Sequence, residues 1–118
     1  GGPVPVGCLS APAEFLAQYP RVTQALTDAV VHALKWLQTA GPSDLIKTVP
    51  ESHLQGDRAI YLATVERSRD AWTADGLMPR GGPEAMNRVG EGTLLAPAEV
   101  ARHFTNAFAQ KAKARFRA

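Results

Sequence analysis

Apolar residues recur every three or four positions along one stretch of the chain, from Tyr19 to Gly41. This spacing places them on one face of an α-helix. Pro20 is tolerated in a first helical turn, and Gly41-Pro42 provides a stop. The pattern therefore predicts one long amphipathic helix whose apolar face needs a partner. The apolar face comprises Val22, Leu26, Ala29/Val30, Ala33/Leu34 and Leu37, and the opposite face, which we expect to be hydrated, comprises Arg21, Gln24, Asp28, His32, Lys35 and Gln38–Thr39.

Shorter helices are predicted on both sides of this stretch, each beginning at a residue type that favours a helix start: Ser, Thr, Asn, Asp or Pro. They are a short helix capped by Ser10, with Pro12 in its first turn, a helix over 44–49 capped by Ser43, a helix from 58 to about 71 capped by Asp57, a helix that begins at Pro83, and a last segment that breaks near 103–105 and restarts from Thr105 or Asn106.

The first ten residues contain two prolines among valines, a cysteine and a leucine, which favours an extended segment or a strand. A lone strand is not stable by itself. It therefore pairs with another chain or belongs to a sheet whose other strands are absent from this sequence. We expect a single partial domain over 1–118, extended over 1–10 and helical over 11–118, which is a mainly α fold class.

Composition narrows the range of partners. With 45% apolar and 20% charged residues, the chain is typical of a globular protein and not of a disordered tail. The net charge of +2 is weak, and its basic residues are dispersed except at the C-terminus. Because basic residues complement a helix C-terminus, we expect a solvated helix end there and no nucleic-acid partner. That cluster is Lys111, Lys113, Arg115 and Arg117.

No catalytic or metal-binding constellation is visible, so we expect no enzyme activity, no metal and no cofactor. His32, His53 and His103 stand far apart and have no ligand partner at helical spacing, which favours solvated or capping roles. The carboxylates are spread singly, and the Gly-rich piece over 79–84 lacks a phosphate-binding pattern. Cys8 is the only cysteine, so it cannot form an intramolecular disulfide, and a small buried apolar role is favoured. The aromatic residues are expected to lie in the core.

No membrane-spanning segment and no secretory signal are predicted, since the chain has neither a run of about 18 apolar residues nor a charged start followed by an apolar stretch. If the parent protein is exported, its signal has been removed or lies upstream.

Several short sequence pieces occur in a characteristic order over almost the whole chain. They are the extended segment running into Leu9-Ser10-Ala11 and Glu14-Phe15-Leu16, Tyr19-Pro20 with the following helix, Gly56-Asp57-Arg58 with Tyr61, the turn Asp75-Gly76-Leu77-Met78-Pro79, Pro83-Glu84, and Phe104-Thr105-Asn106-Ala107-Phe108. In this order they resemble the C-terminal part of a periplasmic substrate-binding protein of an ABC transporter, in the sulfonate/nitrate/taurine-type family that also contains thiamine-pyrimidine-synthesis-like proteins.

The resemblance implies a two-lobed α/β protein (type II) that closes on a small molecule in the periplasm and delivers it to an ABC permease. This chain departs from the family because the early strands and the whole second lobe are missing. The resemblance therefore implies a helical C-terminal fragment of such a protein. Because a fragment without its sheet exposes apolar helix faces, we also expect self-association, through the helix over 19–41 or the N-terminal segment.

Ligand contacts in the family come mainly from strand ends that face the cleft, which singles out Cys8, Leu9 and Ser10 as the ligand-binding candidates. The Ser10 hydroxyl can donate to a carboxylate, sulfonate or phosphate oxygen. The alternative roles are Ser10 as a helix cap and Cys8 as a core residue. Two other functions remain open: a free-standing helical protein–protein interaction module, and an enzyme related to pyrimidine synthesis, which would need a His- or Cys-rich site.

Overall fold

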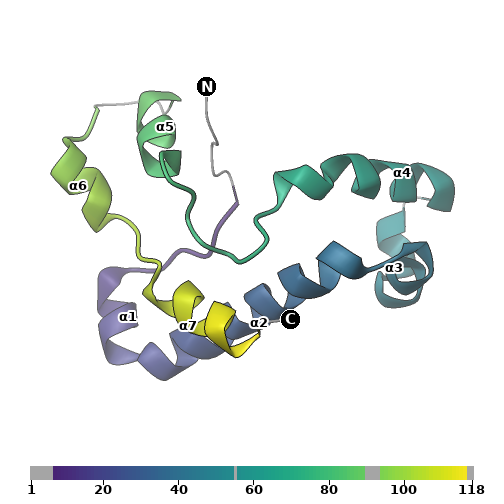
Figure 1. Cartoon of the computed structure of the whole chain (residues 1–118), viewed down its shortest axis with the longest axis horizontal. Coiled ribbons are helices and arrows are strands. Elements are labelled where there is room, and N and C mark those ends of the chain that lie inside the picture. The colour runs from purple at the N-terminus through teal and green to yellow at the C-terminus, as the bar shows by residue number, and fades with distance from the viewer. Residues whose placement is uncertain (1–6, 55, 90–93, 117–118) are drawn as a thin grey trace.

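The computed structural model describes residues 7–54, 56–89 and 94–116, and this part of the chain is mainly helical and contains no strand. Figure 1 shows helix α2 as the longest element, with α1 at one end, α3 and α4 at the other, and α5 and α6 side by side away from it. The elements are α1 (Ala13–Gln18), α2 (Pro20–Thr39), α3 (Pro42–Thr48), η1 (Glu51–Leu54), α4 (Arg58–Ser68), η2 (Arg69–Ala71), α5 (Gly82–Val89), α6 (Pro97–Arg102) and α7 (Ala107–Arg115), where η marks a 3-10 turn.

The predicted long helix is confirmed almost to the residue. Tyr19 has φ −127° and ψ 57°, outside the helical region, because the ring of the following proline disfavours a helical conformation there. The helix then runs from Pro20 to Thr39 and ends before Gly41-Pro42. These boundaries follow from local backbone preferences alone.

Two of the predicted caps are correct and two are wrong. Asp57 caps α4, its carboxylate accepting a hydrogen bond from the N–H of Ile60 at 3.1 Å. The break between α6 and α7 is also confirmed: Asn106 occupies the N-cap position of α7 without a side-chain capping bond, and the Thr105 hydroxyl accepts from the N–H of Ala107 at 3.2 Å. Ser10, however, lies two residues before Pro12, which occupies the N-cap position of α1.

Ser43 is likewise not a cap, because α3 begins one residue earlier, at Pro42. The fixed φ of proline suits a first helical position, so the helix starts there. The Asp44 carboxylate then accepts a hydrogen bond from the N–H of Gly41 at 2.9 Å and closes the first turn.

The predicted extended segment over 1–10 lies partly outside the described residues, which begin at residue 7. Residues 7–10 form neither a helix nor a strand. The mainly helical fold class is therefore shown, whereas the strand is not.

Helix α7 packs on the face of α2 that was expected to be hydrated, so that expectation is wrong. The Gln24 amide donates to the carbonyl of Phe108 at 2.9 Å and to the carboxylate of Asp28 at 2.9 Å. Asp28 is only 8% exposed and also forms an ion pair with Arg115. Val31, 1% exposed, lies on the same face. Both polar side chains find a partner on the neighbouring helix, although the Gln24 Oε1 atom is buried without a hydrogen-bond partner.

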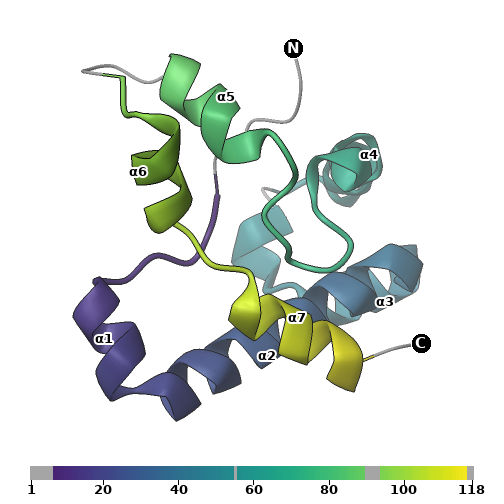
Figure 2. The ribbon, with the colours of Figure 1, turned by 60° about the vertical axis from the view of Figure 1, so that its left-hand side comes forward.

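The predicted apolar face of α2 is left largely uncovered. Val22, Leu26 and Val30 are 48%, 53% and 40% exposed. They lie in the same half of α2 as Gln24, which bonds to α7, but on the other side of the helix. Figure 2 shows α7 lying along one side of α2. The chain therefore folds around the polar face of its longest helix.

The fold consequently has a small core. The accessible surface is 8934 Å², against about 6,200 Å² for a compact monomer of this mass. The radius of gyration is 16.6 Å, against about 13.5 Å for a compact domain of this length. The expectation that the aromatic residues form the core is wrong, because the buried apolar residues of the described part are small or aliphatic. They are Val31, Ala40, Leu45, Leu54, Ala85, Val100, Ala109 and Ala112.

The loop over 72–79, between η2 and α5, approaches α2 closely. The Gln38 amide donates to the carbonyl of Ala74 at 2.7 Å. Gly76 has φ 75°, and a Cβ atom placed on it would lie 2.9 Å from Cγ2 of Val31. Glycine is required here twice, once for the positive φ and once for the contact with the core residue of α2.

We expect Gly76→Ala to lower the free energy of unfolding by about 2 to 5 kcal/mol, since a left-handed conformation costs about 1 to 2 kcal/mol and overpacking adds about 1 to 3. Urea denaturation followed by circular dichroism measures this loss. Gly56→Ala is the matched control, because Gly56 has φ 78° but no atom within 4 Å of the added Cβ. Equal losses for both variants would contradict the close approach to Val31.

Candidate functional site

The loop over 72–79 is held by α7 at two points. The Asn106 side chain accepts a hydrogen bond from the N–H of Met78 at 2.7 Å and donates to the carbonyl of Met78 at 3.5 Å. Lys113 donates to the carboxylate of Asp75 at 3.0 Å. Two of the sequence pieces that carry the resemblance, 75–79 and 104–108, therefore meet in space. The shape of the loop is fixed by contacts across about 30 residues of sequence.

The Asp75 carboxylate turns this loop as well as anchoring it. Its Oδ1 atom accepts a hydrogen bond from the N–H of Leu77 at 3.1 Å, and its Oδ2 atom accepts from Lys113. Burial by itself raises the pKa of Asp75, but the hydrogen bonds from Lys113 and Leu77 and the positive charge of Lys113 outweigh it, so the pKa lies below its ordinary value of 3.8. Asp75 is thus ionised, and its charge is neutralised by α7.

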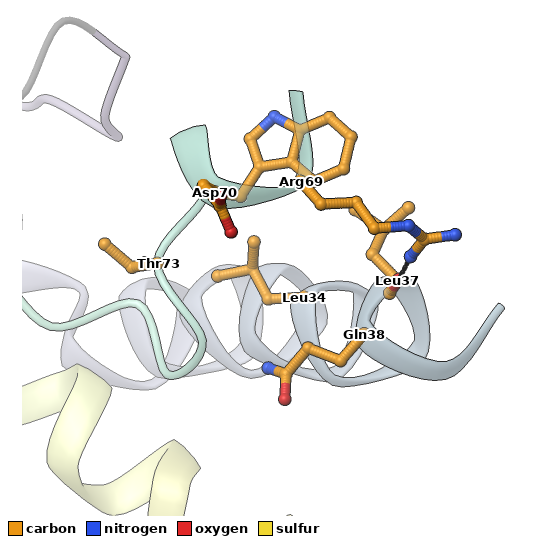
Figure 3. Close-up of a pocket in the computed structure, with 7 residues that line it drawn as sticks. Leu34, Leu37, Gln38, Arg69, Asp70 and Thr73 are labelled. Atoms are coloured by element: carbon orange, nitrogen blue, oxygen red, sulfur yellow. Dashed lines mark hydrogen bonds between the residues drawn. The ribbon is translucent and has the colours of Figure 1, made fainter. Parts of the chain in front are cut away.

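One cavity lies between α2 and η2, as Figure 3 shows, and has a volume of about 210 Å³. Apolar side chains of α2 face charged and aromatic groups that follow α4. The lining residues are Leu34, Leu37, Gln38, Arg69, Asp70, Trp72 and Thr73. Its volume is below the roughly 300 to 1,000 Å³ that is usual for small-molecule pockets.

The polar groups of this cavity are already engaged with the protein. Arg69 donates to the carbonyls of Leu37 at 2.6 Å and Ala40 at 2.8 Å and to the Glu66 carboxylate at 2.7 Å. These carbonyls are at the C-terminus of α2, where a positive charge is favourable and unpaired acceptors need donors. Arg69 therefore serves as the C-terminal cap of α2, and its cavity has little hydrogen-bonding capacity left for a ligand.

A second cavity, of about 300 Å³, lies on the other side of the loop, between the start of α5 and the segment before α7. Arg80 and Glu84 contribute its charges, and Asn106, which clamps Met78, contributes to its wall. The lining residues are Met78, Pro79, Arg80, Gly81, Pro83, Glu84, Phe104 and Asn106. Both cavities therefore combine a cation, a carboxylate and an aromatic side chain, but only the second is lined by Asn106, the residue that clamps the loop.

The structure places the predicted ligand residues away from both cavities. Cys8, Leu9 and Ser10 are exposed, and the Cys8 sulfur lies 3.8 Å from the Ser10 hydroxyl oxygen. The three residues line neither cavity. A buried apolar role for Cys8 is also wrong, because the segment that carries it does not pack into the core.

Within the described residues, no group of three His, Cys, Asp or Glu side chains is arranged to hold a metal ion. None of the described helices is long and apolar enough to span a membrane. His32, expected to be solvated or a cap, stacks on the ring of Phe116 with centroids 4.6 Å apart. The basic C-terminal cluster is only partly solvated, because Lys113 and Arg115 pair with Asp75 and Asp28.

Sequence reasoning missed that Asn106 and Lys113 fix the loop and that Arg69 caps the C-terminus of α2. Each acts through a partner that is distant in sequence, so periodicity and spacing carry no signal for them. The order of the Asp-Gly turn and the Thr-Asn piece in the sequence was the only signal that pointed to these two segments. It did not show that the segments are in contact.

Comparison with solved structures identifies a similar chain. The structure of a protein from Bordetella bronchiseptica RB50 matches with a TM-score of 0.82 and 33% sequence identity. The match covers 90% of this chain and 35% of the Bordetella chain, so this chain spans about a third of that protein's length. No protein-family model matches the sequence, and neither does any curated protein sequence.

We expect Asn106→Ala to lower the free energy of unfolding by about 1 to 3 kcal/mol, because it removes the acceptor for the N–H of Met78 and leaves that part-buried group unpaired. Asn106→Asp keeps the acceptor and should cost less. Asn87→Ala is a control at a second backbone clamp, since Asn87 makes paired hydrogen bonds of 3.0 Å to Leu95. Asn106→Ala should change the tryptophan fluorescence more than Asn106→Asp or Asn87→Ala, since Trp72 begins the clamped loop. An unchanged spectrum in Asn106→Ala would contradict the clamp.

Acid should weaken the same loop. Because the pKa of Asp75 is lowered in the folded state, its contribution to stability is present above pH 3.8 and is lost as the pH falls through the folded pKa. We expect Asp75→Asn to reduce the unfolding free energy at neutral pH and to flatten its decline below pH 3.8. Urea titrations of both proteins at a series of pH values measure this, with Asp70→Asn as the control. Parallel pH profiles for wild type and Asp75→Asn would show that the ion pair has no such role.

Proposed function

We propose that this chain is the C-terminal part of the solute-binding component of an ABC uptake transporter, which acts in the periplasm. In that role the complete protein binds a small molecule of the sulfonate, nitrate, taurine or pyrimidine-like class and passes it to an ABC permease. The chain itself carries out no reaction.

The match to the Bordetella protein is the observation that best supports the proposal. At 33% identity it extends over nine tenths of this chain but over only 35% of the other. A helical segment that corresponds to about a third of a longer protein fits a fragment of a two-lobed protein. The large accessible surface and small core agree with a segment that normally packs against more polypeptide.

The clamped loop would provide the complete protein with a fixed structural element beside a cavity. Asn106 and Lys113 hold the loop over 75–79 against α7, and Gly76 seats it on Val31 of α2. The loop borders the cavity that contains Arg80, whose guanidinium suits an anionic group such as a sulfonate or nitrate. Cys8, Leu9 and Ser10 line neither cavity, so as candidates for ligand contact they would act at a separate site that is completed by polypeptide beyond this segment.

The uncovered apolar face of α2 favours a second candidate function, a helical protein–protein interaction module. Val22, Leu26 and Val30 are all exposed on it. Exposed apolar surface of this kind is typical of interaction sites. The two candidates differ in what they need: the first requires a small-molecule ligand and the second does not.

We expect the protein expressed from the complete reading frame to show a rise in melting temperature with one of these solute classes, because a ligand that binds only the folded state stabilises it by about 2.7 kcal/mol at a hundred times its dissociation constant. A thermal-shift screen against sulfonates, nitrate, taurine and pyrimidines measures the effect. Ser10→Ala should weaken binding about tenfold if its hydroxyl contacts a charged ligand.

Ser43→Ala is the matched control, since Ser43 is an exposed serine within α3, outside both cavities. Equal affinities of the two serine variants would exclude Ser10 from the site. The proposal as a whole would be overturned by a reading frame that starts close to Gly1 or by the absence of any shift across the panel. A partner protein captured without any solute would favour the interaction module.

A further inference from the structure

Asp75 and Gly76 are a chemically sensitive pair in the 72–79 loop. They form the only Asp-Gly pair of the chain, which contains no Asn-Gly pair. An aspartate that precedes glycine is prone to spontaneous ring closure, because glycine has no Cβ atom to shield its nitrogen and its backbone adopts the required conformations freely. At this point, therefore, the backbone of the chain can react with one of its own side chains.

The reaction needs only water and a proton. The Gly76 nitrogen attacks Cγ of the protonated Asp75 carboxyl group, so that a C–N bond forms while the bond from Cγ to the hydroxyl oxygen breaks. The hydroxyl group leaves with the amide proton as water, and the product is a succinimide ring. Water then opens the ring either at Cγ, which restores aspartate, or at the main-chain carbonyl carbon of Asp75. The second opening leaves the main chain running through Cγ, as isoaspartate, and no oxidant or reductant takes part.

Both reacting groups are engaged in the folded protein. The Oδ1 atom of Asp75 accepts from the N–H of Leu77 at 3.1 Å, and its Oδ2 atom accepts from Lys113 at 3.0 Å. The Gly76 N–H, whose proton must be lost for the attack, donates to the Thr73 hydroxyl at 3.1 Å. Although burial raises the pKa of Asp75, the bonds from Lys113 and Leu77 hold it below its ordinary value of 3.8. The carboxyl group therefore lacks the proton that a leaving hydroxyl group requires.

Lys113 is the partner that comes from outside the loop. Leu77 and Thr73 are part of the loop itself, whereas Lys113 lies on α7, 38 residues after Asp75. Its side chain is 50% exposed, so the ion pair is weak enough to open and close. We propose that Asp75-Gly76 is a site of isoaspartate formation that α7 suppresses through Lys113. Release of α7 then exposes the loop to covalent modification.

The modification changes the loop at its most crowded point. Isoaspartate adds one carbon atom to the main chain next to Gly76, where a single added Cβ atom would lie 2.9 Å from Cγ2 of Val31. It also moves the carboxylate away from the position that Lys113 contacts. A loop modified in this way loses the contacts that clamp it to α7. The inference concerns the 118-residue chain itself and does not rest on the proposed function.

The test measures isoaspartate in the 118-residue chain during incubation at neutral pH, in buffer and in concentrated urea. Trypsin releases residues 70–80 as one peptide, in which isoaspartate is separated by reversed-phase chromatography and located by electron-transfer fragmentation. The folded wild type should form isoaspartate more slowly than the unfolded chain. Lys113→Ala should raise the rate in buffer by about two- to fivefold, the factor that corresponds to a partly exposed ion pair, and should leave the rate in urea unchanged.

Two further variants separate the ion pair from charge and from stability. Lys111→Ala removes the same charge from α7 at an exposed lysine that forms no ion pair with any described residue, so its rate should equal that of the wild type. Asn87→Ala weakens a backbone clamp in another part of the fold and should also leave the rate unchanged. The proposal is overturned by equal rates of the wild type in buffer and in urea, by an unchanged rate in Lys113→Ala, or by an equal acceleration in either control.

Discussion

The packing of α7 and the 72–79 loop onto the polar face of α2 is the constraint on which the rest of the structure depends. At its centre Val31 is nearly inaccessible, and beside it Asp28 is buried with partners on both helices. Removing one partner of a buried charge leaves the other without compensation, which costs more than the pair contributes when intact. The contact is therefore specific in a way that an apolar seam alone is not. It fixes which face of α2 receives α7 and at which position along the helix.

Through this contact, residues of α7 fix the position of segments in the middle of the chain. Gln24 bonds to Phe108, Asp28 to Arg115, Asp75 to Lys113 and Met78 to Asn106. All four contacts join α7, or the residue just before it, to segments at least 28 residues earlier. Such non-local contacts form only after the loop-closure entropy has been overcome, so α2 can form early while the 72–79 loop waits for α7. Whatever function the loop has depends on a helix that contributes no lining residue of the first cavity.

The features that the sequence predicted depend on interactions between neighbouring residues, and those that it missed depend on contacts between residues far apart in the sequence. The limits of α2, the Asp57 cap and the break before α7 were predictable because each depends on neighbouring residues. The choice of face was not: periodicity showed that α2 has an apolar and a polar side, but only the partners on α7 decide that the polar side is buried. Ser10 and Ser43 were misassigned because a proline nearby sets the helix start. Cys8 was misassigned because residue type predicts burial only on average, and its segment does not pack against the core.

The distribution of polar and apolar contacts on α2 also links folding to association. Covering the half-exposed side chains of Val22, Leu26 and Val30 would contribute about 3 kcal/mol per chain, taking half of the usual value for burying a large aliphatic residue. A domain of this size is stable by only about 5 to 15 kcal/mol, and one with so small a core lies towards the lower end. Any surface that covers this apolar face of α2, from a second copy or from further polypeptide, would therefore supply a substantial fraction of the stability of the fold. Cover by a second copy would make the measured stability rise with protein concentration, whereas cover by further polypeptide of the same chain would leave it independent of concentration.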